Sequence, residues 1–574
     1  MTTALRDRVG TIARAPLTWI LVAIGALYAV GIGWGLPATD GWDNDGVAPR
    51  DFLAGLVETY SPGKFYTYPP VHVVILGVLT APVTLVALAK ATSLAQPDVI
   101  HEVLKVSYMT PIAYVARFTS LLMALGVVYA LARIGEELRG RRAGLCVAAV
   151  CGVNAPLCYY AHTSNLDVPY LFWGSFALLA LVRVIARREP RRLRAVAVLA
   201  VLSVGTKDQA YALFLFAAPA ALALWASLDV WPRRNARALA RELAVAVVIG
   251  ALMLAVVDAV VINPSGFRAR LHFLVGSASQ DFAHYSNDWL GRALVVKDAV
   301  LHFPRYYPIA FAALFVAGIA VHVVSQRADR SKLAAGFVPL LAILSFTALF
   351  NCVARRTDHR FLLPQYALVA VYAGLSLEAL LFRVRARWSQ WLARAAIALP
   401  FAAAIFACAD VDANLLLDPR YDAERWLSSH VAPTDTIEVH GLNVYLPRLP
   451  TNAHVERVGP EPVDKRNPLP GVVEVTDTFE RAAVRRPKWI VVSQGWVWRY
   501  LSDPRALPPQ GHMVPPTQRA DRSDTDATGF FQGLLSEKRG YRWAHVAKWE
   551  SKTWPVIDIH ASTGREIWIF ERVD

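Results

Sequence analysis

The residues best suited to chemistry are acids in the stretch from Leu36 to Pro70, which lies between two apolar runs. They are Asp40, Asp43, Asp45, Asp51 and Glu58. A carboxylate costs free energy to hold near hydrocarbon, so acids at a membrane edge indicate a functional site, with a solvated loop as the alternative. In a site, a carboxylate can accept the proton of an attacking hydroxyl group.

A second set of residues carries positive charge and lies at the ends of later apolar runs. It consists of Lys207, Arg268, Arg270, Arg305, Arg355, Arg356, His359 and Arg360. Arg and Lys bind phosphate oxygens through charge-assisted hydrogen bonds, and lipid phosphates lie at this depth. Alternatively, these cations pair with the acids of the first loop or reach anionic headgroups without specificity. Together the two sets suit group transfer from a lipid phosphate.

Composition places the chain in the membrane. Its 574 residues are 55% apolar, and the mean hydropathy is +0.35. The net charge of +14 comes from arginines clustered between apolar runs, which favours a membrane topology signal over nucleic-acid binding. The five cysteines lie in or beside apolar runs without metal-ligand spacing, so we interpret them as packing residues.

Apolar runs of spanning length predict about eleven crossings. The predicted spans are Leu17 to Gly35, Pro111 to Ala132, Ala143 to Tyr160, Val168 to Ile185, Leu193 to Gly205, Ala210 to Leu228, Leu243 to Ile262, Pro308 to Val324, Leu333 to Phe350, Phe361 to Leu381 and Leu392 to Ala409.

The arginine clusters decide the orientation, because cytoplasmic loops carry an excess of Lys and Arg. All clusters become cytoplasmic, with the N-terminus inside, only if the apolar run from Pro70 to Leu88 contributes no net crossing. That run then either re-enters or returns through the segment from Gln96 to Tyr108. This topology predicts a first outer loop over residues 36–110 within a membrane domain over residues 1–410.

Composition changes after Asp410: apolar runs shorten to strand length, and no further span follows. We predict a small extracytoplasmic α/β domain over residues 411–574. Its predicted elements are a helix at Tyr421 to His430 and strands at Thr436 to His440, Trp489 to Ser493 and Glu566 to Phe570. The Pro-rich and Asp-rich segment from Pro504 to Thr528 is predicted to be a mobile loop.

Several candidate residues have simpler interpretations. Asp40 and Asp45 each stand close to a glycine and could be turn residues. Asp167 precedes an apolar run and could cap its helix or support a site. Lys207 lies in a tight connection between apolar runs, where an unpaired cation is costly, so a functional role is favoured.

These motifs resemble those of the GT-C glycosyltransferases, most closely the family 39 group of protein O-mannosyltransferases and lipid A aminoarabinose transferases. Asp43-Asn44-Asp45 takes the place of the Asp-Glu pair of that family. The other similar motifs are Tyr68-Pro69-Pro70, the stretch from His162 to Tyr170 with Asp167, Gly205-Thr206-Lys207, and His359-Arg360-Phe361-Leu362-Leu363-Pro364. Two departures stand out, since Asn44 replaces a glutamate and Thr67 and Tyr68 stand where some members carry an acid.

The resemblance implies a mostly helical GT-C fold with re-entrant or juxtamembrane helices, and transfer of a sugar from polyprenyl phosphate with inversion. Asp43 would be the base, with Asp45 as a second catalytic acid. The residues implied to hold the donor phosphate are Lys207, Arg360, His359 and Arg305, and those implied to support the site are Asp167, Tyr68 and Asp40. The implied partners are the polyprenyl-phosphate sugar, membrane lipids, and a protein, lipid or glycan acceptor with a hydroxyl or amine group.

Two other classes of function compete with this interpretation. A transporter or flippase for a lipid-linked glycan would carry charges deep inside its spans and interrupted helices in corresponding halves. A catalytically inactive scaffold is the other alternative, because Asn44 replaces the expected glutamate. No metal ligand set is predicted, although the acidic loop leaves a divalent cation open. The expected location is the cytoplasmic membrane, with catalysis at its outer face.

Overall fold

The computed structural model describes residues 16–38, 42–43, 49–93, 96–228, 233–276, 283–383, 387–463, 469, 471–501, 525–550, 552 and 563–573. Contacts divide the chain into two compact units. The first comprises Met1–Ile32, Asp51–Ala81 and Val115–Ala409, and the second comprises Gly33–Arg50, Pro82–Tyr114 and Asp410–Asp574.

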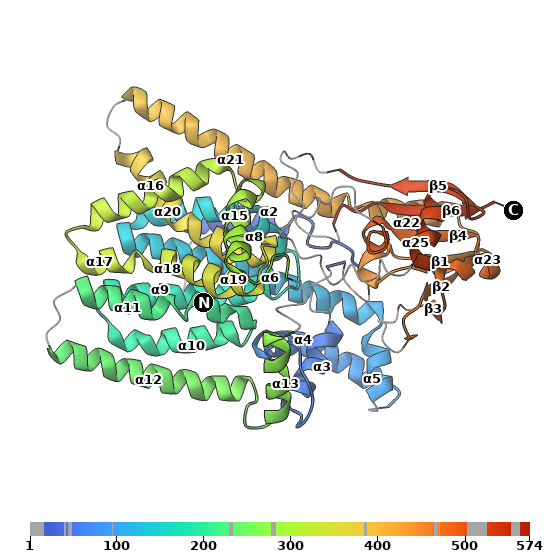
Figure 1. Cartoon of the computed structure of the whole chain (residues 1–574), viewed down its shortest axis with the longest axis horizontal. Helices are drawn as coiled ribbons and strands as arrows, with labels where there is room; N and C mark the ends of the chain where they lie inside the picture. Colours follow the sequence, from blue (N-terminus) through green and yellow to red (C-terminus); the bar gives the residue numbers. More distant parts are fainter. Residues whose placement is uncertain are drawn as a thin grey trace, which may run out of the picture. The chain divides into compact units, whose positions relative to one another are not determined.

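Helices make up most of the chain before residue 430 (Figure 1). The first ten are α2 (Pro16–Ala29), α3 (Pro49–Tyr60), α4 (Val71–Lys90), α5 (Gln96–Val103), α6 (Val106–Arg139), α7 (Arg141–Gly152), α8 (Ala155–Ala161), α9 (Asp167–Ala186), α10 (Leu193–Val204) and α11 (Ala217–Leu228). The later ones are α12 (Arg233–Val257), α13 (Pro264–Val275), α15 (Trp289–Tyr306), α16 (Ile309–Gln326), α17 (Arg330–Ala335), α18 (Val338–Phe346), α19 (Cys352–Ala354), α20 (Leu363–Arg383), α21 (Arg387–Leu416) and α22 (Pro419–His430).

The described part of the chain contains nine helical segments long and apolar enough to cross a membrane. The count reaches ten if α7 and α8, which are bent by 71° at their break, form one span. Helices α2 and α10, both predicted spans, have only 14 and 12 residues. The mostly helical, multi-pass class predicted from composition is therefore confirmed.

Helix α4 covers the apolar run from Pro70 to Leu88. The arginine clusters predicted that this run contributes no net crossing of the membrane. Helix α4 has 20 residues, enough to span hydrocarbon, whereas α5 has eight and is too short to bring the chain back. Whether α4 crosses or re-enters stays a prediction, and the length of α4 favours a crossing.

Small residues allow close helix packing around α20, which contacts α16 and α7. A Cβ added at Gly318 of α16 would lie 1.9 Å from the carbonyl oxygen of Tyr372 in α20. A Cβ added at Gly374 of α20 would lie 2.6 Å from the Cα of Val147 in α7. Helices in lipid gain stability from such close approach, since hydrocarbon provides no hydrophobic driving force between them.

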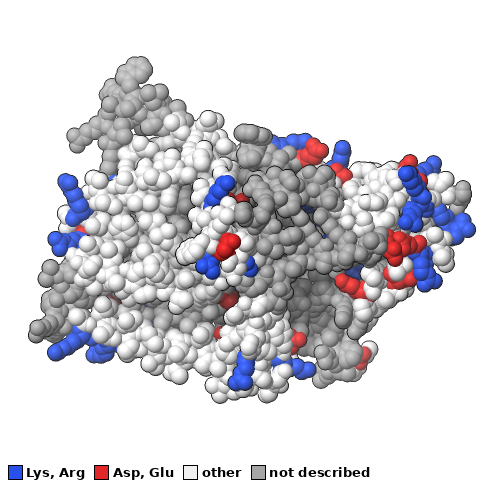
Figure 2. Space-filling view, viewed as in Figure 1, with Lys and Arg blue, Asp and Glu red and all other residues white. Residues whose placement is uncertain are grey.

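Charged side chains avoid the flanks of these helices. On the face seen in Figure 2, the bundle is largely uncharged, and Lys and Arg gather at the end where α16 gives way to α17. This distribution is typical of a protein with a lipid-facing belt.

A six-stranded sheet forms the C-terminal part of the second unit, in the order β3-β2-β1-β4-β6-β5. The strands are β1 (Thr436–His440), β2 (His454–Gly459), β3 (Val472–Thr476), β4 (Trp489–Ser493), β5 (Tyr541–Ala547) and β6 (Ile567–Arg572). Strands β3, β2, β1 and β4 run parallel, whereas β6 pairs antiparallel with β4 and β5.

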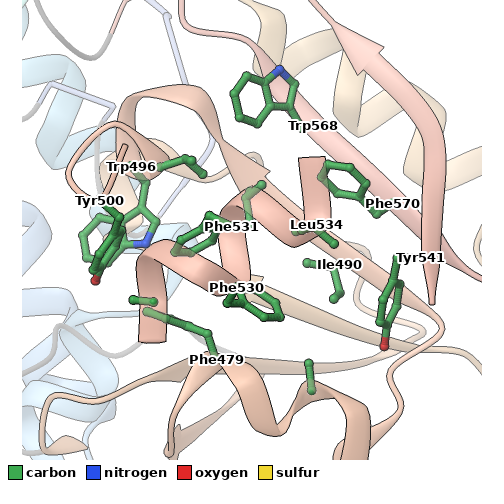
Figure 3. Packing of buried hydrophobic residues seen from close by; sticks show 14 of the residues in the cluster. Phe479, Ile490, Trp496, Tyr500, Phe530, Phe531, Leu534, Tyr541, Trp568 and Phe570 are labelled. Carbon is green, nitrogen blue, oxygen red and sulfur yellow. The ribbon is translucent and has the colours of Figure 1, made fainter. Parts of the chain in front are cut away.

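Each face of the sheet buries its own apolar cluster, because side chains alternate along a strand. One cluster joins α22 to Ile437 and Val439 of β1. The other joins α25 (Thr525–Leu535) to Ile490 and Val492 of β4 through the aromatic rings drawn in Figure 3. The domain is therefore a layered α/β fold, as the sequence predicted.

The predicted helix at Tyr421 to His430 and the predicted strands all appear, with α22 starting two residues earlier and β6 ending two residues later. Strands β2, β3 and β5 were not predicted. Most of the predicted loop from Pro504 to Thr528 lies outside the described residues, and its last residues begin α25.

Candidate functional site

A buried ion pair lies at the end of two predicted spans. Lys207 Nζ donates a hydrogen bond to Asp167 Oδ1 over 2.7 Å, and the Asp167 side chain is fully buried. Gln209 Nε2 also donates to Asp167 Oδ1 (3.2 Å) and to the Tyr170 hydroxyl (2.9 Å). The other carboxylate oxygen, Asp167 Oδ2, is buried without a hydrogen-bond partner among the described residues.

Local structure explains how these groups meet. Asp167 is the first residue of α9, and its backbone N–H donates to the Asn165 side chain. Lys207 lies in the turn between α10 and the 3₁₀ helix η2 (Asp208–Leu213), and α10 packs against α9. The capping interpretation of Asp167 is wrong, because the cap position is Leu166 and the carboxylate accepts from Lys207 instead.

Three cations gather at the ring of Phe361. The guanidinium carbons of Arg356 and Arg360 each lie 4.6 Å from the ring centroid, and Lys207 Nζ lies 6.0 Å from it. The negative face of an aromatic ring attracts cations, so one side chain can hold several together. Lys207 and Arg360, both implied phosphate ligands, thus approach one ring from different segments.

The loop that carries these arginines is held by a buried amide. Asn351 Nδ2 donates to the carbonyl oxygens of Arg356 (3.2 Å) and Phe361 (3.0 Å). Gln365 Nε2 in turn donates to Asn351 Oδ1 over 2.7 Å. Asn351 ends a π-helical turn, η3 (Thr347–Asn351), a feature frequent at functional sites. The sequence could have indicated Asn351 and Gln365 as functional residues, because polar side chains in or beside apolar runs are unusual.

Histidine 359 joins the same loop to α8 and α15. His359 Nε2 lies 2.7 Å from the Tyr160 hydroxyl, and its ring stacks on Tyr160 and contacts Tyr306. Nearby, burial disfavours ionisation of Asp358, but the charges of Arg356 and His284 outweigh it and lower the pKa of Asp358. The Asp358 carboxylate stays ionised and pairs with Arg356 over 3.0 Å.

Arg270 belongs to a separate, internally neutralised cluster. It is 1% exposed, pairs with Asp208 and Asp258, and lies over the ring of Tyr66. Burial raises the pKa of Asp258 to about 6, although Arg270 opposes the shift. Arg270 was grouped with the phosphate-binding cations from sequence. Here its two terminal nitrogens bind Asp258 and Asp208, while its Nε is buried without a partner among the described residues, so the phosphate-binding role stays a prediction.

The acidic loop is described only in part. Asp43 is buried, and the neighbouring Trp42 packs edge-on to Tyr421 at 4.9 Å, with the Arg420 guanidinium 4.2 Å above its ring. Asp40 and Asp45 lie outside the described residues, as does the side chain of Arg305.

Tyr68, the remaining predicted supporting residue, is 43% exposed. No role follows from exposure alone, so its supporting role stays a prediction.

Residues that sequence reasoning had not placed in the site complete its geometry. They are Tyr160, Tyr170, Gln209, Asn351, Asp358 and Gln365. As a whole, the arrangement offers positive charge and hydrogen-bond donors to an anion at the ends of helices.

No protein-family model matches the sequence, and no curated protein matches it. The chain is similar to solved glycosyltransferase structures. The Archaeoglobus fulgidus oligosaccharyltransferase in the apo form matches at 14% identity and a TM-score of 0.42, over 75% of this chain and 63% of that enzyme. This chain therefore spans less than two thirds of that enzyme.

Two further structures match over longer stretches. AglB from Archaeoglobus fulgidus, in complex with an inhibitory peptide and a dolichol-phosphate, shares 12% identity and a TM-score of 0.43 over 96% of this chain and 88% of its own. ArnT from Cupriavidus metallidurans, bound to undecaprenyl phosphate, shares 14% identity and a TM-score of 0.41 over 97% and 98%. At these scores the similarity carries no argument about the chemistry of this chain.

Proposed function

We propose that this protein is a GT-C glycosyltransferase similar to family 39, which moves a sugar from a polyprenyl-phosphate donor to a hydroxyl or amine acceptor. The reaction would take place at the outer face of the cytoplasmic membrane, with the domain after Asp410 on that side. The observation that carries the proposal is the gathering of Lys207, Arg356 and Arg360 at Phe361.

The charge of this cluster suits a phosphate. Lys207 pairs with Asp167 and Arg356 pairs with Asp358, so these two cations are already held in place beside Arg360 at the Phe361 ring. Arg and Lys stabilise phosphate oxygens by charge-assisted hydrogen bonds, and such donors act most strongly where water is scarce.

In the proposed reaction, an acceptor O–H or N–H attacks the anomeric carbon from the side opposite the phosphate. A new bond forms to that carbon, and the bond from carbon to phosphate oxygen breaks, which inverts the configuration. Asp43 takes the acceptor proton, and the departing polyprenyl phosphate carries the electron pair as added negative charge. Lys207 and Arg360 stabilise that charge, and Asp167 orients the ammonium group of Lys207.

Asp45 as a second acid, His359 and Arg305 as further phosphate ligands, and Tyr68 and Asp40 as supporting residues remain parts of the proposal. So does a divalent cation at the acidic loop, where Asp40 and Asp45 lie outside the described residues. The rival transporter hypothesis expects charge deep inside spans. The pair that matters here instead occupies helix ends, at Asp167 and Lys207, which favours an enzyme working at lipid headgroups.

A direct test measures sugar transfer by the purified full-length protein with a panel of polyprenyl-phosphate sugars and acceptors. Consumption of one donor with release of polyprenyl phosphate would identify the sugar. Arg360→Gln should weaken binding of undecaprenyl phosphate and slow transfer, whereas Arg237→Gln, which changes an exposed cation on α12 outside the candidate set, should leave both unchanged.

Equal loss in both variants would assign the effect to general surface charge. Consumption of no donor by a folded protein that still binds undecaprenyl phosphate would favour the transporter or scaffold alternatives.

A further inference from the structure

A groove that the proposed reaction does not use lies between α7, α20 and α21. Its cavity volume is about 260 Å³, and almost all of its lining is apolar. It is lined by Arg142, Leu145, Cys146, Ala149, Leu377, Leu381, Phe382, Ile397 and Phe401. No side chain among the described residues fills it.

The sequence explains why the groove forms. On α7 the lining positions 142, 145, 146 and 149 follow the helical spacing of one face, and two of them carry the small side chains of Cys146 and Ala149. The larger Leu381 and Phe401 supply the opposing walls. The seven helical steps from position 142 to position 149 give the groove a length of about 10 Å along α7.

One end of the groove carries a cation. Arg142 is exposed, and its guanidinium lies 4.9 Å from the ring centroid of Phe382. With Arg133, Arg139 and Arg141 it forms an arginine cluster between two predicted spans. Such clusters predict the cytoplasmic side, so the groove would open at that surface and run toward the bilayer centre. An empty apolar groove in hydrocarbon forfeits packing contacts on one side, so a flexible chain should occupy it.

We propose that this groove is a binding site for an anionic phospholipid of the cytoplasmic leaflet. One acyl chain lies along the apolar faces of α7, α20 and α21, and the phosphate of the headgroup accepts hydrogen bonds from Arg142. Basic pockets between membrane helices on the cytoplasmic side are suited to anionic headgroups. The site lies at the membrane surface opposite to the proposed reaction, so it is independent of that function.

The test uses the full-length protein purified in detergent and titrated with dioleoyl phosphatidylglycerol, with dioleoyl phosphatidylcholine as the uncharged-headgroup comparison. Native mass spectrometry counts the retained lipids. The wild type should retain one phosphatidylglycerol in preference to phosphatidylcholine. Arg142→Gln should weaken that binding by about tenfold or more, as expected for the loss of one charge-assisted contact.

Two further variants separate the groove from general surface charge. Arg141→Gln changes an adjacent exposed arginine that does not line the groove and should bind phosphatidylglycerol as the wild type does. Ala149→Phe fills the groove and should abolish retention while leaving Arg142 in place.

Three results would overturn the proposal. They are equal losses in the two arginine variants, unchanged retention in Ala149→Phe, and displacement of phosphatidylglycerol by undecaprenyl phosphate, which would make the groove a polyprenyl site instead.

Discussion

Two buried charge clusters in this molecule use the same kinds of side chain in different ways. In the sheet domain, Glu438 Oε1 accepts from Arg485 Nη2 over 2.8 Å and lies 2.7 Å from His440 Nε2. Glu438 Oε2 accepts from Arg485 Nε over 2.8 Å. Both oxygens of this buried acid are therefore satisfied inside the domain, and Asp477 adds a second anion to Arg485.

At the helix ends, the corresponding acid is only half satisfied. Asp167 Oδ1 accepts from Lys207 and Gln209, while its Oδ2 has no partner in the described part of the chain. The cations at Phe361 come from two segments separated by more than a hundred residues of sequence.

The difference teaches how to tell a structural ion pair from a site. A buried charge is costly, and a closed network offsets that cost internally. Where donors and acceptors are left over beside several like charges, a ligand of the opposite charge can offset the cost instead. We propose on this basis that the Glu438 cluster is structural and that the Lys207 cluster binds a ligand, although His440 Nδ1 in the first cluster is also buried without a partner among the described residues.

The largest effect is expected for the proposed base. Asp43→Asn keeps the size of the side chain but removes the proton acceptor, so transfer should fall by about a thousandfold. The assay is the initial rate at saturating donor and acceptor, with the thermal unfolding midpoint as the check on folding. A folded variant with the wild-type rate would remove Asp43 from the mechanism.

The next largest effect is expected in the Lys207 cluster. Lys207→Gln removes a positive charge that would stabilise the departing phosphate, so the rate of transfer should fall by about a hundredfold. It also leaves Asp167 buried without a counter-charge, so the unfolding midpoint should drop.

The matched double variant, Asp167→Asn with Lys207→Gln, removes both charges of the pair. We expect recovery of the unfolding midpoint without recovery of transfer. If transfer returned together with stability, the pair would be structural, and the contrast with Glu438 would disappear.

In the Glu438 cluster, acid should lower the stability of the sheet domain, and substitutions should leave the rate of sugar transfer unchanged. Bonds from Arg485 and His440 outweigh burial and lower the pKa of Glu438 to about 2, from an ordinary value of 4.5. The contribution to stability is therefore complete above pH 4.5 and is lost as the pH falls toward 2. Glu438→Gln should destabilise the domain at pH 7 by about 2 kcal/mol, and the difference should shrink in acid.

Hydrogen exchange of peptides that cover β1 in the full-length protein measures this effect. Unchanged protection of β1 in Glu438→Gln at pH 7 would contradict the structural role of the cluster.

The smallest effect concerns Asp258, whose raised pKa of about 6 compares with an ordinary value of 3.8. Between these two values the folded state binds more protons than the unfolded state, so stability falls as the pH rises through this window. Asp258→Asn cannot titrate in this window, so it should flatten that slope. Thermal unfolding between pH 4 and pH 7 measures it, and a slope equal to that of the wild type would contradict the assignment.

Much of the architecture was predictable because it depends on short-range patterns. Spans follow from the cost of exposing backbone and polar groups to hydrocarbon, which long apolar runs such as α9 and α20 avoid. Strands β4 and β6 contain continuous apolar runs, and β1 alternates apolar and polar residues. Strands β2 and β5 were missed because charged residues such as Glu456 and Arg457 interrupt their pattern, whereas β3 has a pattern as regular as that of β1.

By itself, then, the sequence determined the multi-pass helical class, the presence of a C-terminal α/β domain and the chemical types available at the helix ends. Only the tertiary structure decided which charges have partners. Lys207 meets Asp167 from 40 positions away, whereas Arg270 is neutralised by Asp208 from 62 positions away. Such choices depend on how helices pack, and no local pattern in the chain records which distant carboxylate a cation will reach.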